Sequence, residues 1–242
     1  MNIETNEKLV RRNARIGQIS MIAGLVVLVA GMILSIRATS LFGLSLVALV
    51  LGFALSQIGI FYGNRWGRRP RPDEMLNVAL KGLDGKYSIY HYLTPASHLL
   101  VGPAGIWIIL PKTQRGTITF EGNRWRQRGG GLMMSYLKLF AQEGIGRPDL
   151  EILNEVESLE KYLKKLTENE EIPSIKSALV FTNEKANIQI DEDDNPPAAT
   201  LPLNKLKDFF RKASKSKPIS FEKIQQIQSL ISGTDEEPAA PS

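Results

Sequence analysis

The hydrophobic residues of this 242-residue chain are concentrated in two long runs near its start. Residues 16–36 and residues 41–62 form stretches of 21 and 22 residues without a charged side chain. As helices that rise about 1.5 Å per residue, each would reach about 30 Å, the thickness of the hydrocarbon layer of a bilayer. A cleaved signal peptide would not need a second run of equal length. The pattern predicts two transmembrane helices, with a pair of buried core helices as the alternative.

Four residues, 37–40, separate the two runs, so the helices should form a tight antiparallel hairpin. Small residues recur at spacings of four and seven in both runs, which places each set on one side of its helix and allows close backbone approach. The glycines expected in this packing are Gly24, Gly31, Gly52 and Gly59. Glycines that face lipid are the alternative, and a homo-oligomer could also form through the hairpin.

The rest of the chain alternates between helical and strand-like periodicities. Helices are expected at 73–83, 149–168, 205–213 and 221–231, with a weak one at 136–142. Strands are expected at 87–92, 98–101, 106–110, 116–120, 177–181 and near residue 200. Gly102-Pro-Ala-Gly105 should be the turn of a hairpin. This order predicts an α/β domain with a mixed central sheet flanked by helices.

These patterns divide the chain into five parts. They are a basic N-terminal segment (1–15), the hairpin (16–64), a basic linker (65–71), a soluble domain (72–232) and a disordered tail (233–242).

The net charge of +5 is distributed unevenly. Residues 1–71 hold nine of the 30 Lys and Arg but two of the 25 Asp and Glu, which leaves 21 and 23 for the rest. The basic excess therefore lies beside the apolar runs, where it indicates anionic headgroups and membrane topology rather than a nucleic-acid footprint. Four basic residues precede the hairpin and four follow it, so both termini should be cytoplasmic. We expect a multi-pass protein of a bacterial inner membrane, with the lipid bilayer as a partner.

Several kinds of chemistry are excluded by composition. The chain has no cysteine, which rules out disulfides, thiolate metal sites and a cysteine nucleophile. His91 and His98 are its two histidines, too few to suggest a zinc site. It has neither a glycine-rich phosphate loop followed by lysine nor a nucleophile elbow.

The order and spacing of several residues in 72–232 resemble the nuclease-related domain (NERD) family. The clearest part is the predicted hairpin, with His98, the Val-Gly-Pro-x-Gly turn at 101–105, Lys112, Gly116 and a later Trp125. Arg147-Pro148 stands where the family often has Asn-Pro before a helix, and Val180-Phe181 fits its later strand. The family is thought to have the PD-(D/E)xK restriction-endonuclease-like fold, so the resemblance implies that fold here.

The resemblance also implies a metal-dependent nuclease site with two carboxylates. Phosphodiester hydrolysis needs a divalent cation, and Mg²⁺ prefers carboxylate oxygens. Family members that look active have Asp just before the histidine and Glu two residues before the lysine. Here Ser97 and Leu110 occupy these places, and Lys112 alone remains. On this alignment the catalytic motif is degenerate and no metal ligand set is left.

An acidic ligand could have been relocated. Glu74 matches a glutamate that the family often has on the preceding helix, and Glu121, Glu143 and Glu151 are other candidates. Ordinary salt bridges or solvated side chains are the alternative for each of them.

Arg124, Arg126 and Arg128, with Trp125 between them, form the best local anion patch. The arginines could grip phosphates while the indole stacks on a base. The same residues could equally face lipid headgroups or protect a strand edge.

The sequence thus favours a membrane-anchored, cytoplasm-facing NERD-like protein that is a binding or scaffolding module without cofactor. One alternative is a metal-dependent nuclease, using Mg²⁺ and relocated acids, that acts on DNA or RNA. The other is a structural membrane protein without a ligand.

Overall fold

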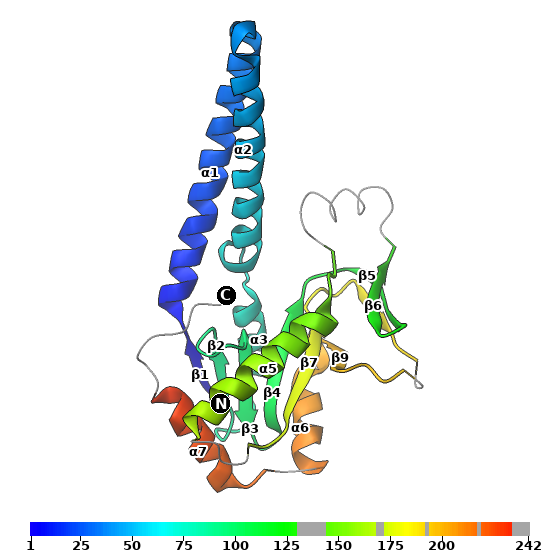
Figure 1. Cartoon of the computed structure of the whole chain (residues 1–242). Coiled ribbons are helices and arrows are strands. Elements are labelled where there is room, and N and C mark those ends of the chain that lie inside the picture. The colour runs from blue at the N-terminus through cyan, green and yellow to red at the C-terminus, as the bar shows by residue number, and fades with distance from the viewer. Residues whose placement is uncertain (130–143, 168–171, 192–193, 217–218, 234–242) are drawn as a thin grey trace. The chain divides into compact units, whose positions relative to one another are not determined.

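The computed structural model describes residues 1–129, 144–167, 172–191, 194–216 and 219–233. The expected weak helix at 136–142, Glu143 and nearly all of the expected tail lie outside these residues. The chain forms two units (Figure 1). One unit is residues 7–71, and the other joins residues 1–6 to the chain from residue 72 onward.

The first unit is a helical hairpin. Helix α1 spans Glu7–Arg37, a short 3-10 turn follows at Thr39–Leu41, and helix α2 spans Phe42–Tyr62 before a π-helical turn at Gly63–Gly67. Both helices are long and apolar enough to cross a membrane, by length and composition. Helix α1 begins at Glu7, nine residues before the apolar run, so the basic residues that precede the run are also helical.

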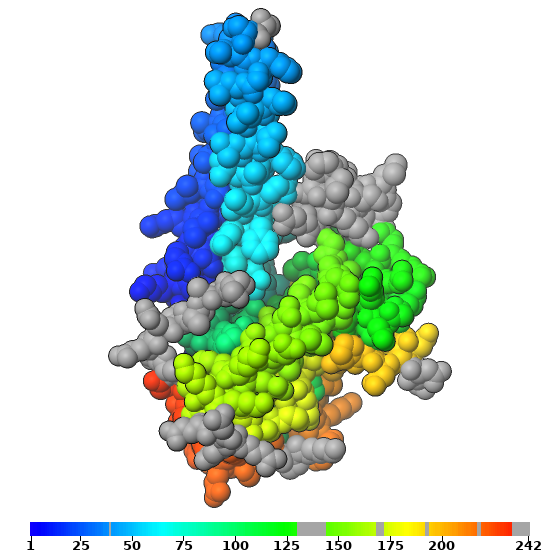
Figure 2. All heavy atoms as spheres, viewed as in Figure 1, coloured from blue at the N-terminus to red at the C-terminus, as the bar shows by residue number. Residues whose placement is uncertain are grey.

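The two helices pack through their glycines, and their side chains touch along the hairpin (Figure 2). A Cβ added at Gly24 would lie 2.6 Å from the Ser56 hydroxyl, and one at Gly59 would lie 2.7 Å from the backbone nitrogen of Met21. Gly31 and Gly52 likewise face the opposite helix. These small faces are therefore used inside the hairpin, and an oligomer would have to form through the outer faces, which carry larger apolar side chains.

The second unit is built on a six-stranded mixed sheet in the order β1-β2-β3-β4-β7-β9. Strands β2, β3 and β4 are antiparallel neighbours, whereas the β1–β2, β4–β7 and β7–β9 pairs are parallel. The strands are Asn2–Thr5, Ser88–His91, His98–Gly102, Gly105–Lys112, Ile175–Phe181 and Ala199–Pro202. This confirms the expected mixed α/β architecture after two long apolar helices.

Alternation along the central strands gives this sheet two buried faces. Trp107 and Ile109 of β4 pack with helices α3 (Pro72–Leu80) and α6 (Leu206–Ser216), the latter preceded by a 3-10 turn at Leu203–Lys205. Ile106 and Ile108 point to the other side, against α5 (Pro148–Leu166) and α7 (Phe221–Ser232). Because both faces are covered, β4 reads as a continuous apolar run. Figure 1 shows α5 crossing one face of the sheet.

A smaller three-stranded sheet in the order β6-β5-β8 lies beside the end of α5 that begins at Pro148. Strand β5 spans Gly116–Glu121, β6 spans Arg124–Arg128 and β8 spans Ala186–Gln189. Phe120 and Trp125 share an apolar cluster with Ile152 of α5 and with Leu179 and Phe181 of β7.

Strand β1 changes the expected domain plan. The sequence placed residues 1–15 in one basic segment, but residues 2–5 pair with β2 in the sheet, and Glu7 begins the hairpin. The Asn2 and Asn6 backbone N–H groups donate to the Tyr87 and His91 carbonyls at 2.8 and 3.0 Å. The hairpin is therefore inserted between the first strand of the sheet and α3, rather than attached before the domain.

Candidate functional site at the ends of β3 and β4

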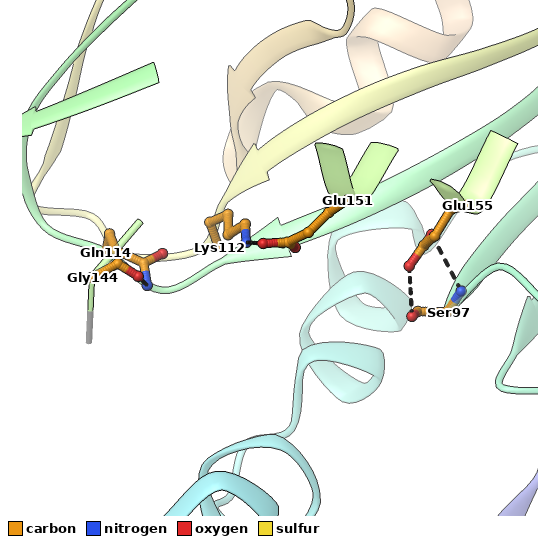
Figure 3. A network of polar contacts seen from close by, with 6 residues as sticks. All are labelled: Ser97, Lys112, Gln114, Gly144, Glu151 and Glu155. Carbon is orange, nitrogen blue, oxygen red and sulfur yellow. Dashed lines mark hydrogen bonds and ion pairs between the residues drawn. The ribbon is translucent and has the colours of Figure 1, made fainter. Parts of the chain in front are cut away.

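The antiparallel pairing of β3 with β4 brings the start of one strand beside the end of the other. The register pairs Leu99 with Ile108, so the residues just before β3 lie close to the last residues of β4. The start of β3 and the end of β4 thus bring together Ser97, His98, Leu110 and Lys112, as the predicted hairpin requires. Glu151 and Glu155 of α5 point toward Lys112 and Ser97 there (Figure 3).

Lys112 is held by Glu151 from the first turn of α5. Its ammonium donates to both carboxylate oxygens of Glu151, each at 2.8 Å. The lysine side chain is 13% exposed, whereas that of Glu151 is 44% exposed. Lys112 is the last residue of β4, and its side chain is largely covered because Glu151 of α5 lies against it.

Ser97 is held in the same way by Glu155, one helical turn further along α5. Its hydroxyl donates to one carboxylate oxygen at 2.8 Å, and its backbone N–H approaches the other at 3.4 Å (Figure 3). Residues four apart lie on one face of a helix. The two glutamates therefore join α5 to the two strand ends, and we call Ser97, Lys112, Glu151 and Glu155 the clamp.

Leu110 has a purely apolar role. Its side chain is buried with Ile118, Trp125 and Phe181. A hydrocarbon side chain offers no metal ligand, and nothing polar replaces it at this position in the strand. Nearby, Gln114 donates its amide to the Gly144 carbonyl at 3.1 Å, which ties the end of this hairpin to the approach to α5.

The donor set of the clamp does not fit a hard cation. Two carboxylates are present, but one is neutralised by an ammonium and the other accepts from a hydroxyl and an amide. Among the described residues, no group of three or more His, Asp or Glu side chains is placed to hold a metal ion. Of the other relocated acids considered, Glu121 pairs with Arg126 and Arg128, and Glu74 lies in the first turn of α3.

His98, the residue after Ser97, is part of a buried series of polar contacts with His91 and Asn77. Its Nδ1 lies 2.8 Å from Nδ1 of His91, whose Nε2 lies 2.9 Å from the amide oxygen of Asn77. An amide oxygen can only accept, so His91 carries its proton on Nε2 and, when neutral, accepts at Nδ1 from His98. The pair thereby links β2 and β3 to α3, and both rings are buried.

Arg147 and Asp149 form an ion pair at the start of α5. The guanidinium approaches the carboxylate to 2.6 Å. This hydrogen bond lowers the pKa of Asp149, so the first turn of the helix keeps a negative charge beside its N-terminal amides.

The basic strand β6 does not present its tryptophan to solvent. Successive side chains of a strand point to opposite faces, so Trp125 lies opposite the arginines beside it. It is 3% exposed, packs on Phe120 with ring centroids 4.8 Å apart, and donates to the Thr200 hydroxyl at 3.2 Å. Stacking of this indole on a base was one of the alternatives for the patch, and the burial of Trp125 speaks against it. Arg124, Arg126 and Arg128 are exposed on the other face, where the last two pair with Glu121.

Comparisons with protein-family models, curated proteins and solved structures found no match to this chain.

Removal of Lys112 should weaken the attachment of α5. We expect Lys112→Ala to lower the free energy of unfolding by about 0.5–1.5 kcal/mol, since it removes a partly exposed ion pair and strands the Glu151 carboxylate. Glu151→Gln should cost a similar amount, and the double variant should cost less than the sum. Chemical denaturation of the four proteins measures this. Lys164→Ala, at an exposed position of α5, is the control; additive losses would contradict the pairing.

Proposed function

We propose that this chain is a membrane-anchored protein whose soluble unit is a nuclease-like module that binds or scaffolds without cutting. The observation that carries the proposal is the clamp. Where the NERD resemblance calls for two free carboxylates, the chain has Ser97 and Leu110, and the lysine that would face a phosphate is engaged by Glu151. These contacts use the polar groups to position a helix.

The architecture is consistent with this proposal. The resemblance implied a mixed central sheet flanked by helices, and the unit has such a sheet, with helices packed on both faces. The hairpin turn, Lys112 and Trp125 occur in one folded unit in the order that the resemblance uses. We propose the restriction-endonuclease-like fold for this unit as well.

The insertion of the hairpin supports a two-span anchor. Strand β1 precedes α1, and β2 follows α2, yet the two strands are hydrogen-bonded neighbours. The chain on the two sides of the hairpin must therefore lie in one compartment. Two crossings satisfy this condition, and a single crossing cannot. The basic residues that flank the hairpin favour the cytoplasm as that compartment.

The test is a cleavage assay on the full-length protein in detergent. Linear, supercoiled and single-stranded DNA and RNA are incubated with wild type, Lys112→Ala and Glu151→Gln in Mg²⁺ and in Mn²⁺. We expect no cleavage that distinguishes the three proteins, because both carboxylates that the described residues bring to the strand ends already have protein partners.

Cleavage by wild type that is lost in both variants would contradict the proposal. It would favour a nuclease in which Glu151 and Glu155 act as relocated ligands. Lys164→Ala controls for contaminating nucleases, which would be equally active in every preparation.

A further inference from the structure

The basic residues at the start of α1 lie on one face of the helix. They are Lys8, Arg11, Arg12 and Arg15, at spacings of three, four and seven from the first. At about 100° per residue, this spacing confines them to about 100° of the helix circumference. We call them the basic stripe. The buried residues Val10, Asn13 and Gly17 lie on the opposite side of α1, where Gly17 packs on Tyr62 and Gly63.

The basic stripe is exposed and has no acidic partner within its unit. All four side chains are exposed, and the structure assigns none of them an ion pair among the residues that it describes. Glu7 is the one acidic residue between positions 7 and 71, and its carboxylate lies 3.5 Å from Arg71. Four like charges on one face repel one another, so a counter-ion would stabilise this arrangement.

The position of the basic stripe along α1 matches the headgroup layer of a bilayer. The apolar run begins at Ile16, directly after Arg15. The stripe extends about 10 Å along the helix, close to the thickness of one headgroup layer. Phe61 and Tyr62 at the end of α2 form an aromatic cluster with Trp66 of the following π-helical turn, of the kind that anchors at this level. Arg65 lies 5.0 Å from the Trp66 ring.

We propose that the basic stripe binds the headgroups of anionic phospholipids. The inference rests on the proposed membrane anchor, because the depth of the stripe follows from insertion of residues 16–36. Guanidinium groups bind phosphate oxygens through paired hydrogen bonds, and three of the four residues are arginines. An anionic lipid keeps its net negative charge beside these groups, whereas the choline of a zwitterionic lipid cancels the charge of its phosphate. Selectivity for net charge therefore distinguishes a headgroup site from simple residence in a bilayer.

The experiment uses the full-length protein in phosphatidylcholine vesicles that contain a trace of spin-labelled lipid. The fraction of label immobilised by the protein is compared for phosphatidylglycerol and phosphatidylcholine. We expect phosphatidylglycerol to associate about threefold more strongly, as suits several basic groups at a screened surface. Replacement of the four residues of the basic stripe by Gln should lower this ratio clearly, with the arginines after the hairpin accounting for any selectivity that remains. High salt should lower the ratio in the wild type.

The matched control removes four exposed lysines from the other unit, Lys164, Lys205, Lys212 and Lys215. This variant has the same net charge as the stripe variant and should keep the wild-type ratio. Equal association of the two lipids with wild type, or an unchanged ratio in the stripe variant, would overturn the proposal. Extraction of the protein by alkaline carbonate is measured in parallel. A protein that carbonate removes contradicts the anchor as well, whereas a retained protein without selectivity contradicts the headgroup site alone.

Discussion

Residues 72–233 expressed alone should be less stable than the same residues preceded by 1–6 and a short Gly/Ser linker. We expect a difference in the free energy of unfolding of about 2–4 kcal/mol, from several backbone hydrogen bonds and from exposure of the edge of β2. All four residues of β2 are buried, and Met1 packs against the core cluster that contains Leu76. Both chains lack the hairpin, so thermal or chemical denaturation isolates the contribution of β1.

The control replaces residues 1–6 by Gly and Ser while keeping the chain length. It should behave like residues 72–233 alone, because the flexible segment lacks the contacts of Asn6 with Tyr92 and of Glu4 with Ser232. Equal stability of all three chains would show that β1 adds nothing to the unit. It would also remove the argument that both flanks of the hairpin share a compartment.

Gly102→Ala should destabilise the soluble unit by about 2–4 kcal/mol, since a methyl group there overlaps the ring of a buried tyrosine. A Cβ at this position would collide with the Cδ1, Cε1 and Cγ atoms of Tyr87. The ring is 3% exposed, and its hydroxyl donates to the Phe210 carbonyl at 3.4 Å. Burial also raises the pKa of Tyr87. A shift of this ring would disturb the hydrogen bond that joins Tyr87, the residue before β2, to Phe210 of α6.

A double-mutant cycle identifies the cause. Gly102→Ala should cost much less in a Tyr87→Ala background, where the overlap is gone, and the two losses should not add. Gly85→Ala is the control because a Cβ there meets no atom within 4 Å. A loss of the same size in both backgrounds would mean that backbone conformation, rather than the tyrosine, requires glycine at 102.

The apolar pattern predicted the elements that have long periodic segments. Helix α5 follows from spacings of three and four, and its Leu159 and Leu163 are buried as that pattern requires. The β3–β4 hairpin follows from two apolar runs around Gly102-Pro-Ala-Gly105. Strands β1 and β8 could not be predicted in this way. Each has four residues, and the one large apolar residue of β1, Ile3, is 49% exposed. Their pairing depends on partners far away in the sequence.

The candidate site was predictable only in part. The resemblance identified Ser97, Leu110 and Lys112, but the contacts of the clamp join residues 58 and 39 positions apart and depend on how α5 crosses the sheet. Glu155 was missed for this reason, although its spacing of four from Glu151 was a signal that the two share a helix face. The burial of Trp125 had a local signal, since Arg-Trp-Arg-Gln-Arg alternates as a strand with one buried face does.

We expect Glu151 and Glu155 to hold α5 to the sheet and not to bind a metal ion. Titration of the full-length protein with Mn²⁺, with free Mn²⁺ followed by electron paramagnetic resonance, tests this directly. We expect no saturable site with a dissociation constant below about 1 mM, because both carboxylates already have protein partners. Glu151→Gln and Glu155→Gln should give the same curve as wild type. One Mn²⁺ bound per chain in wild type, and lost in both variants, would contradict the account.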